Sequence, residues 1–355
     1  MRTARAIGLL AAVLAPAAVR GATDAAADFP NVRVGGQLFA DFTYQAAPSG
    51  TDAAGNAIHP NSFNVTRAYV NVFGNLSRVI SARITSDIVR DTDPNSSLSG
   101  SAVYRLKYAY AQAALDDAIG RGSWIRIGLQ STPYISYVEE VYPYRFQGPL
   151  FFDREGLLVS ADAGISARWA FPFDYGDVVV GVFNGEGYAH SEANDQKALQ
   201  ARIGIRPLPR HPVLRGLRFA VFGDRDHYQG SDPKDRLAGV VTFEHPWFNA
   251  GFEFGRFRDR STPGASEANG RGWSAWATPR TPIGVGGLLR YDHTEPDEHT
   301  GATRTREIAG IAYWFPLQKG IATAVMVDYE RDRYPGFSPP KPTEERWALH
   351  TLVSF

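Results

Sequence analysis

Arginine is the residue type in this sequence that is best placed to do chemistry. Its guanidinium stays charged at every physiological pH and can hold an oxyanion through two parallel hydrogen bonds. Basic residues recur at alternate positions of short apolar segments, and in an extended chain such positions share one polar face. The basic residues expected on such polar faces are Arg33, Arg67, Arg83, Arg105, Lys107, Arg126, Arg168, Arg202 and Arg206, and they would line the pore if the segments enclose one. These basic residues could together guide anions. Alternatively, acidic residues on the same face, such as Asp41 and Asp87, could neutralise individual arginines.

A second group of charges lies in the stretch 132–160, which is the longest stretch between alternating segments. Its charged residues are Glu139, Glu140, Arg145, Asp153, Arg154 and Glu155, and tyrosines and phenylalanines stand among them. One interpretation is a loop that folds into a pore and narrows it, where charged side chains would decide which ions pass. The other is an external loop packed by its own aromatic residues.

Other kinds of chemistry find little support. The chain has no cysteine, which excludes a disulfide, a thiolate metal site and a cysteine nucleophile. Most histidines fall in or near expected turns without compact metal-ligand spacing, and His350 shares its face with Arg346 rather than with an outward serine. We therefore expect no catalytic residue, no metal and no cofactor. A formal net charge of zero gives no reason to expect nucleic-acid binding.

The elements that must carry these residues are strands, because the alternation has a period of two. In the segment 32–45 the even positions are apolar and most odd positions are polar. The same pattern predicts sixteen strands, at 32–45, 63–74, 79–90, 102–115, 123–131, 161–172, 178–185, 197–206, 217–227, 236–244, 248–258, 271–278, 285–293, 304–315, 320–333 and 345–355.

The predicted connections alternate between long and short. Long polar ones include 46–62, 91–101 and 132–160, whereas 75–78 and 245–247 are short. Long loops on one rim and tight turns on the other are typical of a transmembrane β-barrel, and a soluble sandwich has no reason to alternate in this way. The sequence thus favours an all-β, sixteen-stranded antiparallel transmembrane barrel.

The N-terminus has the pattern of a secretory signal. Arg2 and Arg5 precede an apolar run at 6–19, which is too short to span a membrane, and small residues follow. We expect residues 1–27 to be a signal peptide and residues 28–355 to form the barrel. No later stretch is apolar enough for a membrane helix, so an exported chain that enters a membrane would do so as a barrel.

Aromatic residues agree with this arrangement. Trp169, Trp247 and Trp314 stand beside predicted short turns, where a girdle at the membrane interface is expected. Phe355 ends an alternating last strand. A terminal aromatic residue on such a strand resembles the assembly signal that the barrel insertion machinery reads in bacterial outer membranes.

The first half of the chain resembles the phosphate- and pyrophosphate-selective class of Gram-negative outer-membrane porins. Three stretches in residues 32–170 carry the resemblance: Arg67-Ala68-Tyr69-Val70 up to Gly74 with 84–87, then 125–130 with Pro133-Tyr134, and finally 152–156 with 162–165. The family often has two adjacent arginines where this chain has Arg67 alone, and its phosphate-binding lysine has no counterpart here.

The resemblance implies a homotrimeric porin through which small hydrophilic solutes diffuse passively, with a preference for anions such as phosphate. Outer-membrane lipid and the insertion machinery would be its partners, and the bacterial outer membrane its location. Three alternatives stay open: a substrate-specific saccharide channel, an export barrel, and a secreted soluble β-sandwich that binds a ligand.

Overall fold

The computed structural model describes residues 28–355, except 193, 229, 231, 262–263, 265 and 319. The expected signal peptide, residues 1–27, lies outside the described residues. The barrel strands are β1 (Asn31–Ala47), β4 (Asn61–Asn75), β5 (Ile80–Arg90), β6 (Ala102–Ala114), β7 (Trp124–Ser131), β8 (Ala161–Ala170), β9 (Gly176–Phe183), β10 (Ala198–Ile205), β11 (Leu217–His227), β12 (Pro233–His245), β13 (Phe248–Asp259), β14 (Ala268–Pro279), β15 (Val285–Glu295), β16 (Arg304–Trp314), β17 (Ala322–Arg333) and β18 (Glu344–Ser354).

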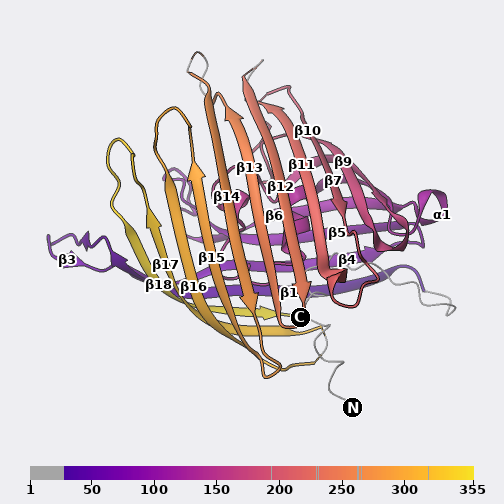
Figure 1. Ribbon diagram of the computed structural model, residues 1–355, viewed down its shortest axis with the longest axis horizontal. Helices are drawn as coiled ribbons and strands as arrows, with labels where there is room; N and C mark the ends of the chain where they lie inside the picture. Colours follow the sequence, from indigo (N-terminus) through magenta and orange to yellow (C-terminus); the bar gives the residue numbers. More distant parts are fainter. Residues whose placement is uncertain are drawn as a thin grey trace.

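These strands form one closed ring in which neighbours in sequence pair antiparallel (Figure 1). The ring closes where β1 pairs with β18, with Asp41 opposite His350. Closure matters because a membrane offers no water to satisfy the backbone of a free sheet edge. The prediction of a sixteen-stranded antiparallel barrel is confirmed, and the predicted strand ends agree with the observed ones to within a few residues.

Short elements occupy the connections. The pair β2 (Gly50–Thr51) and β3 (Ala57–Ile58) forms a small hairpin between β1 and β4. The helices are α1 (Asp116–Ile119), α2 (Pro133–Glu139) and α3 (Phe151–Arg154), with 3-10 turns at Pro172–Asp174 and Leu214–Gly216. No helix in the described part of the chain is long and apolar enough to cross a membrane.

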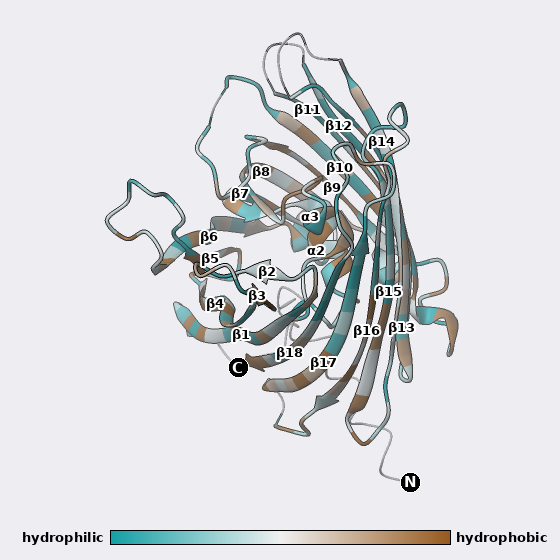
Figure 2. Cartoon of the chain, turned by 90° about the vertical axis from the view of Figure 1, so that its left-hand side faces the viewer, coloured by the Kyte–Doolittle hydropathy of each residue, from teal (hydrophilic) through white to brown (hydrophobic). Residues whose placement is uncertain are grey.

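The outer face of the barrel wall is apolar and its inner face is polar, which is the reverse of the arrangement in a soluble protein. On β17, Val327 is 51% exposed on the outside, whereas its neighbour Asp328 is 1% exposed on the inside. Large apolar residues of the strands, such as Ile127, Val221 and Ile311, are exposed on the outside, and Figure 2 shows hydrophobic and hydrophilic residues following one another along the strands. Leaving that much apolar surface in water would be unfavourable, whereas lipid tails accept it. The soluble sandwich is therefore wrong, and the barrel belongs in a bacterial outer membrane.

Aromatic residues mark both borders of the apolar outer face. Near the short turns, Trp169 and Trp247 are 51% and 54% exposed and face outward. Near the long loops, Tyr329 and Trp347 pack with their ring centroids 5.0 Å apart. Trp314 is an exception to the prediction, because it faces inward and its indole N–H donates to Tyr144 inside the barrel, at 3.3 Å.

Candidate pore and its constriction loop

A β-bulge shapes the basic part of the inner wall. Across β5 and β6, Thr85 pairs with Tyr108 and Ser86 pairs with Leu106, so Lys107 is an extra residue in β6. A bulge of this kind changes which side chains point to which face. The two neighbours Lys107 and Tyr108 consequently both face the inside of the barrel. The ammonium of Lys107 donates to the hydroxyl of Ser160 and lies 3.7 Å from the ring centroid of Tyr188.

The arginines of this wall stack on aromatic rings. The guanidinium carbon of Arg67 lies 4.6 Å from the ring centroid of Tyr69. Arg83 lies 4.4 Å from Tyr108, and Arg126 lies 4.2 Å from Tyr110. An aromatic face attracts a guanidinium and fixes its plane, but it does not cancel the positive charge. Stacking therefore holds these arginines in place while leaving their field in the lumen.

Neutral groups supply the hydrogen bonds of two of these arginines. Arg83 donates to the side-chain oxygens of Thr85 and Asn71, both at 2.9 Å. Arg126 donates to Gln112 at 2.8 Å. Within the described residues, Arg33, Arg67, Arg83 and Arg126 have no carboxylate at ion-pair distance. This part of the wall thus keeps its positive charge uncompensated at short range.

The part of the wall formed by β15–β18 has the contrary arrangement. Arg290 is held by Asp292 at 2.8 Å, and Arg306 contacts Asp292 and Asp332 at 3.4 and 3.0 Å. On β18, Arg346 lies 2.9 Å from Glu330. Burying charges in a narrow, poorly hydrated space requires such partners. Positive charge is therefore compensated on β15–β18, whereas the arginines Arg33, Arg67, Arg83 and Arg126 on β1, β4, β5 and β7 keep theirs.

The stretch 132–160 lies inside the ring of strands, and Figure 2 shows α2 and α3 there. Five of its side chains are fully buried, namely Tyr134, Ile135, Val138, Tyr142 and Phe151. They pack with Phe222, Trp276, Leu288 and Ile308 from the inner faces of β11, β14, β15 and β16. The loop thereby fills the part of the lumen next to these strands.

Inward-facing glycines make room for the loop. A Cβ on Gly255 would collide with the ring of Phe152, and one on Gly272 would collide with the ring of Phe151. Close packing leaves no slack for an added methyl group in such places. Because Gly255 and Gly272 have no side chains, the rings of Phe152 and Phe151 pack directly against the backbone of β13 and β14.

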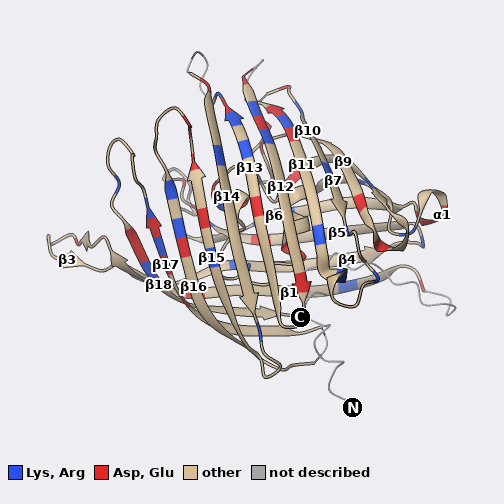
Figure 3. Ribbon diagram, in the orientation of Figure 1, with Lys and Arg blue, Asp and Glu red and all other residues tan. Residues whose placement is uncertain are grey.

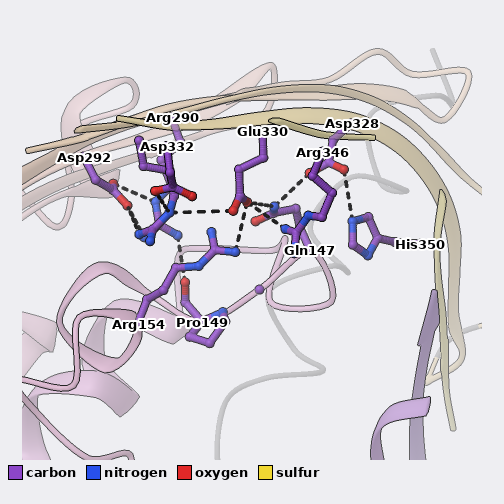
Figure 4. Close-up of polar contacts among 12 residues, drawn as sticks. Gln147, Pro149, Arg154, Arg290, Asp292, Asp328, Glu330, Asp332, Arg346 and His350 are labelled. Atoms are coloured by element: carbon purple, nitrogen blue, oxygen red, sulfur yellow. Dashed lines mark hydrogen bonds and ion pairs between the residues drawn. The ribbon is translucent and has the colours of Figure 1, made fainter. Parts of the chain in front are cut away.

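Polar contacts then fix the loop to the wall (Figure 4). Arg154 lies 2.9 Å from Glu330, and Glu155 lies 2.8 Å from Arg306. Gln147 donates to Asp328 at 2.8 Å. On the other side, Tyr134 donates its hydroxyl to Glu253 at 3.0 Å, and burial together with this carboxylate raises the pKa of Tyr134 well above its ordinary value, so it remains a neutral donor.

A cavity of about 400 Å³ remains between the loop and the basic wall. From the loop, Glu139, Glu140 and Arg145 line it. Glu139 lies 2.6 Å from Arg145, and Glu140 lies 2.9 Å from Arg218 of the wall. Both loop carboxylates are thus engaged by arginines, while the stacked arginines face them across the cavity.

The predicted residues divide into those that line this cavity and those that do not. The basic residues that line it are Arg33, Arg67, Arg83, Lys107, Arg126, Arg168 and Arg202. Arg105 instead donates to the hydroxyl of Tyr188 at 2.7 Å, and Arg206 follows the end of β10 in a connection. In the loop, Asp153 contacts Arg145 at 3.3 Å, and Arg154 and Glu155 point into the wall rather than into the cavity.

Sequence reasoning missed the aromatic partners of the arginines. Tyr69 stands two residues after Arg67, and Trp124 stands two residues before Arg126, with its ring centroid 4.1 Å from the guanidinium. Residues two apart in a strand share a face. An aromatic residue at that spacing was the available signal. Tyr188 carried no such signal, because it comes from the connection after β9.

The geometry around His350 offers hydrogen bonding rather than a catalytic arrangement. Its Nε2 lies 3.1 Å from Asp328, and its Nδ1 lies 4.0 Å from Asp41. Among the described residues no group of three or more His, Cys, Asp or Glu side chains could hold a metal ion.

Comparisons with known proteins identify the fold. No protein-family profile and no curated sequence matches the chain. Solved structures do match: the anion-selective porin from Comamonas acidovorans (TM-score 0.61, 11% identity) covers 92% of this chain and 100% of its own. OmpF of Salmonella typhi, in a complex with daunomycin, has a TM-score of 0.62 at 13% identity over 92% of this chain and 98% of its own.

A third match is OmpT, an outer-membrane protein of Vibrio cholerae, in a trimer form. Its TM-score is 0.59 at 11% identity, over 92% of this chain and 100% of that one. At these identities the comparisons establish the porin-like barrel fold and leave the solute open.

Proposed function

We propose that this chain is a porin through which small hydrophilic solutes diffuse passively across the outer membrane, with a preference for anions such as phosphate. The observation that carries the proposal is the uncompensated charge of Arg33, Arg67, Arg83 and Arg126 along one side of the cavity. The channel performs no catalysis and uses no cofactor.

Proximity makes this charge effective. An ion that passes the narrow cavity comes close to fixed charges, and water screens them incompletely over such distances. Screening limits the field to roughly 10 Å at 0.1 M salt, which is comparable to the width of a constricted lumen. The loop carboxylates oppose the effect weakly, because Glu139 and Glu140 are each paired with an arginine.

Oxyanions fit this wall better than simple halides do. The ring that stacks on each guanidinium leaves the N–H edge for a ligand, and that edge matches two oxygens of a phosphate or a carboxylate. Arg83 and Arg126 also hold neutral side chains as acceptors, which an oxyanion could replace without separating an ion pair.

The saccharide channel receives less support. Sugar binding would need free aromatic faces along the path, but the loop aromatics Tyr134, Tyr142 and Phe151 are fully buried against the wall. Aromatic rings that line the cavity are instead covered by guanidinium groups, as Arg67, Arg83 and Arg126 show. A homotrimer remains part of the proposal, and the trimer form of OmpT from Vibrio cholerae supports it. Chemical cross-linking in detergent would test it, because a monomer would give no higher band.

The test of function is the reversal potential of single channels in a planar bilayer under a salt gradient. The expected sign is that of an anion-preferring channel, with a further preference for phosphate over chloride when the two are exchanged. A cation-preferring sign would reject the anion path but leave a general porin, whereas absence of any conductance would reject both.

A further inference from the structure

The connection between β10 and β11, residues 206–216, is longer than most turns on the same rim of the barrel. Three prolines stand in it, at 207, 209 and 212, and each fixes its own φ and restricts the residue before it. The ring of His211 braces the turn, because its Nδ1 accepts the backbone N–H groups of Val213 at 3.2 Å and Leu214 at 3.0 Å. The turn therefore has a preformed shape.

The exposed side chains of this turn are basic or apolar. Arg210 and Arg215 are exposed, and in the part of the chain that the structure describes neither has a carboxylate at ion-pair distance. Leu208 and Val213 are 42% and 52% exposed. No acidic residue occurs in 206–216, whereas Figure 3 shows charges of both signs along the strands. The turn thus carries unpaired positive charge next to apolar surface.

The neighbouring turn, between β8 and β9, extends this surface. Phe173 has a φ of 59°, which is rare for a bulky residue, and its ring is 69% exposed. The guanidinium carbon of Arg210 lies 4.9 Å from the centroid of that ring. The backbone N–H of Arg206 donates to the carbonyl of Tyr175 at 2.8 Å and joins the two turns. We call their common surface the periplasmic patch, formed by Phe173, Leu208, Arg210, Val213 and Arg215.

The periplasmic patch lies beyond the apolar outer face of the strands. Ile205 ends β10, Phe219 stands near the start of β11, and these two outward side chains are 45% and 41% exposed. The chain between them leaves the strands at the rim of short turns, which faces the periplasm in barrels of this kind. An exposed apolar surface beside charged groups marks a site of interaction with another molecule. The positive charge of the patch requires that molecule to be anionic.

We propose that the periplasmic patch binds an acidic, extended segment of a periplasmic protein. Arg210 and Arg215 donate paired hydrogen bonds to carboxylates of that segment, and apolar side chains of the segment pack on Leu208, Val213 and Phe173. The preformed shape favours a peptide over anionic phospholipid, because a rigid surface lowers the cost of ordering a peptide, whereas fluid headgroups gain little from a fixed shape. The proposal rests on the outer-membrane location and is independent of the solute that the channel carries.

The test uses the full folded protein in neutral detergent and a fluorescein-labelled nonapeptide in which Glu and Leu alternate. Fluorescence anisotropy measures binding. We expect R210Q/R215Q to bind the peptide at least roughly tenfold more weakly than the unaltered protein, since charge-assisted hydrogen bonds are lost. V213S should also weaken binding, because it removes part of the apolar contact. Equal binding by R210Q/R215Q, or equal binding of a peptide with Gln in place of Glu, would overturn the proposal.

The matched control is R78Q/R121Q, which removes the same charge from two other turns of this rim. It should bind the peptide as the unaltered protein does, and an equal loss there would overturn the proposal in favour of a general attraction to a basic rim. Displacement of the peptide by phosphatidylglycerol would overturn it in favour of lipid binding.

A second control separates the periplasmic patch from the pore. R67Q/R83Q/R126Q should bind the peptide as tightly as the unaltered protein does, whereas a loss would place the peptide in the lumen and overturn the proposal. R210Q/R215Q should in turn keep the single-channel conductance of the unaltered protein. The peptide measurement and the reversal potential can therefore fail independently of each other.

Discussion

Arg306 on β16 and Glu155 in the loop between β7 and β8 lie 2.8 Å apart, although 151 residues separate them in the sequence. Both side chains are almost fully buried. This pair, with the pair between Arg154 and Glu330, ties the loop to one side of the barrel and thereby leaves the open space beside the basic wall.

Glu155→Gln should loosen this attachment. Arg306 keeps Asp292 and Asp332 as partners, so we expect a loss of about 1–3 kcal/mol in the free energy of unfolding, the range for a buried hydrogen bond to a charged group. Thermal unfolding in detergent measures it, and single-channel current should become noisier as the loop moves. Glu298→Gln is the control, because Glu298 pairs with Arg271 at an exposed position on the outside; an equal loss there would remove the role given to Glu155.

The stacked arginines give a second prediction. Replacing Arg67, Arg83 and Arg126 with Gln should shift the reversal potential toward cations, with a permeability ratio lower by roughly fivefold, the equivalent of about 1 kcal/mol for a charge close to the passing ion. Arg78→Gln serves as control, since Arg78 pairs with Asp117 at 2.9 Å in an exposed position near the short turns. An unchanged potential in the triple variant would make these arginines structural partners of their aromatic neighbours.

The strands could be predicted from sequence because their signal is local. Apolar and polar residues alternate along each strand, as in β17, where Val327 faces lipid and Asp328 faces the interior, and each residue reports its own face. The bulge at Lys107 could not be predicted in this way. Strict alternation places Lys107 on the inner face and Tyr108 on the outer one, whereas the extra residue turns both inward.

The path of the loop was beyond sequence reasoning for a different reason. Its charged residues were interpreted either as a group that narrows the pore or as part of an external loop, and their partners come from distant strands. Arg154 and Glu155 find Glu330 and Arg306 only once β16 and β17 stand beside the loop. Composition identified the charged loop, and tertiary packing decided that Glu139, Glu140 and Arg145, and not Arg154, face the cavity.

Phe355 gives a third prediction. Its backbone exchanges two hydrogen bonds of 3.0 Å with Gly36 of β1, and a Cβ on Gly36 would collide with the ring of Phe355. If insertion machinery reads the terminal aromatic residue, deletion of Phe355 should lower the outer-membrane yield several-fold while secretion across the inner membrane is unchanged. Gly36→Val moves the ring but keeps the terminal residue, so its yield should fall less. Equal losses in both variants would mean that packing at the β1–β18 seam, and not recognition, accounts for the effect.

The fourth prediction concerns alkaline pH. Burial raises the pKa of Tyr144 to about 12, against the opposing effect of the indole of Trp314, which donates to its hydroxyl. Because the folded state holds this proton more tightly than the unfolded state, stability is fully present below pH 10. It is then lost between pH 10 and 12, by up to about 1.4 kcal/mol per pH unit.

Tyr144→Phe removes the titrating group. At pH 8 the variant should be less stable by about 1 kcal/mol, because the partly buried indole N–H of Trp314 loses its acceptor. Between pH 10 and 12 it should lose less stability than the unaltered protein, so the two unfolding curves converge as the pH rises. Thermal unfolding in detergent at half-unit intervals from pH 8 to pH 12 provides the measurement. Tyr313→Phe is the control, since Tyr313 faces outward and is 39% exposed. Parallel unfolding curves for Tyr144→Phe and the unaltered protein would show that Tyr144 does not govern the loss of stability at alkaline pH.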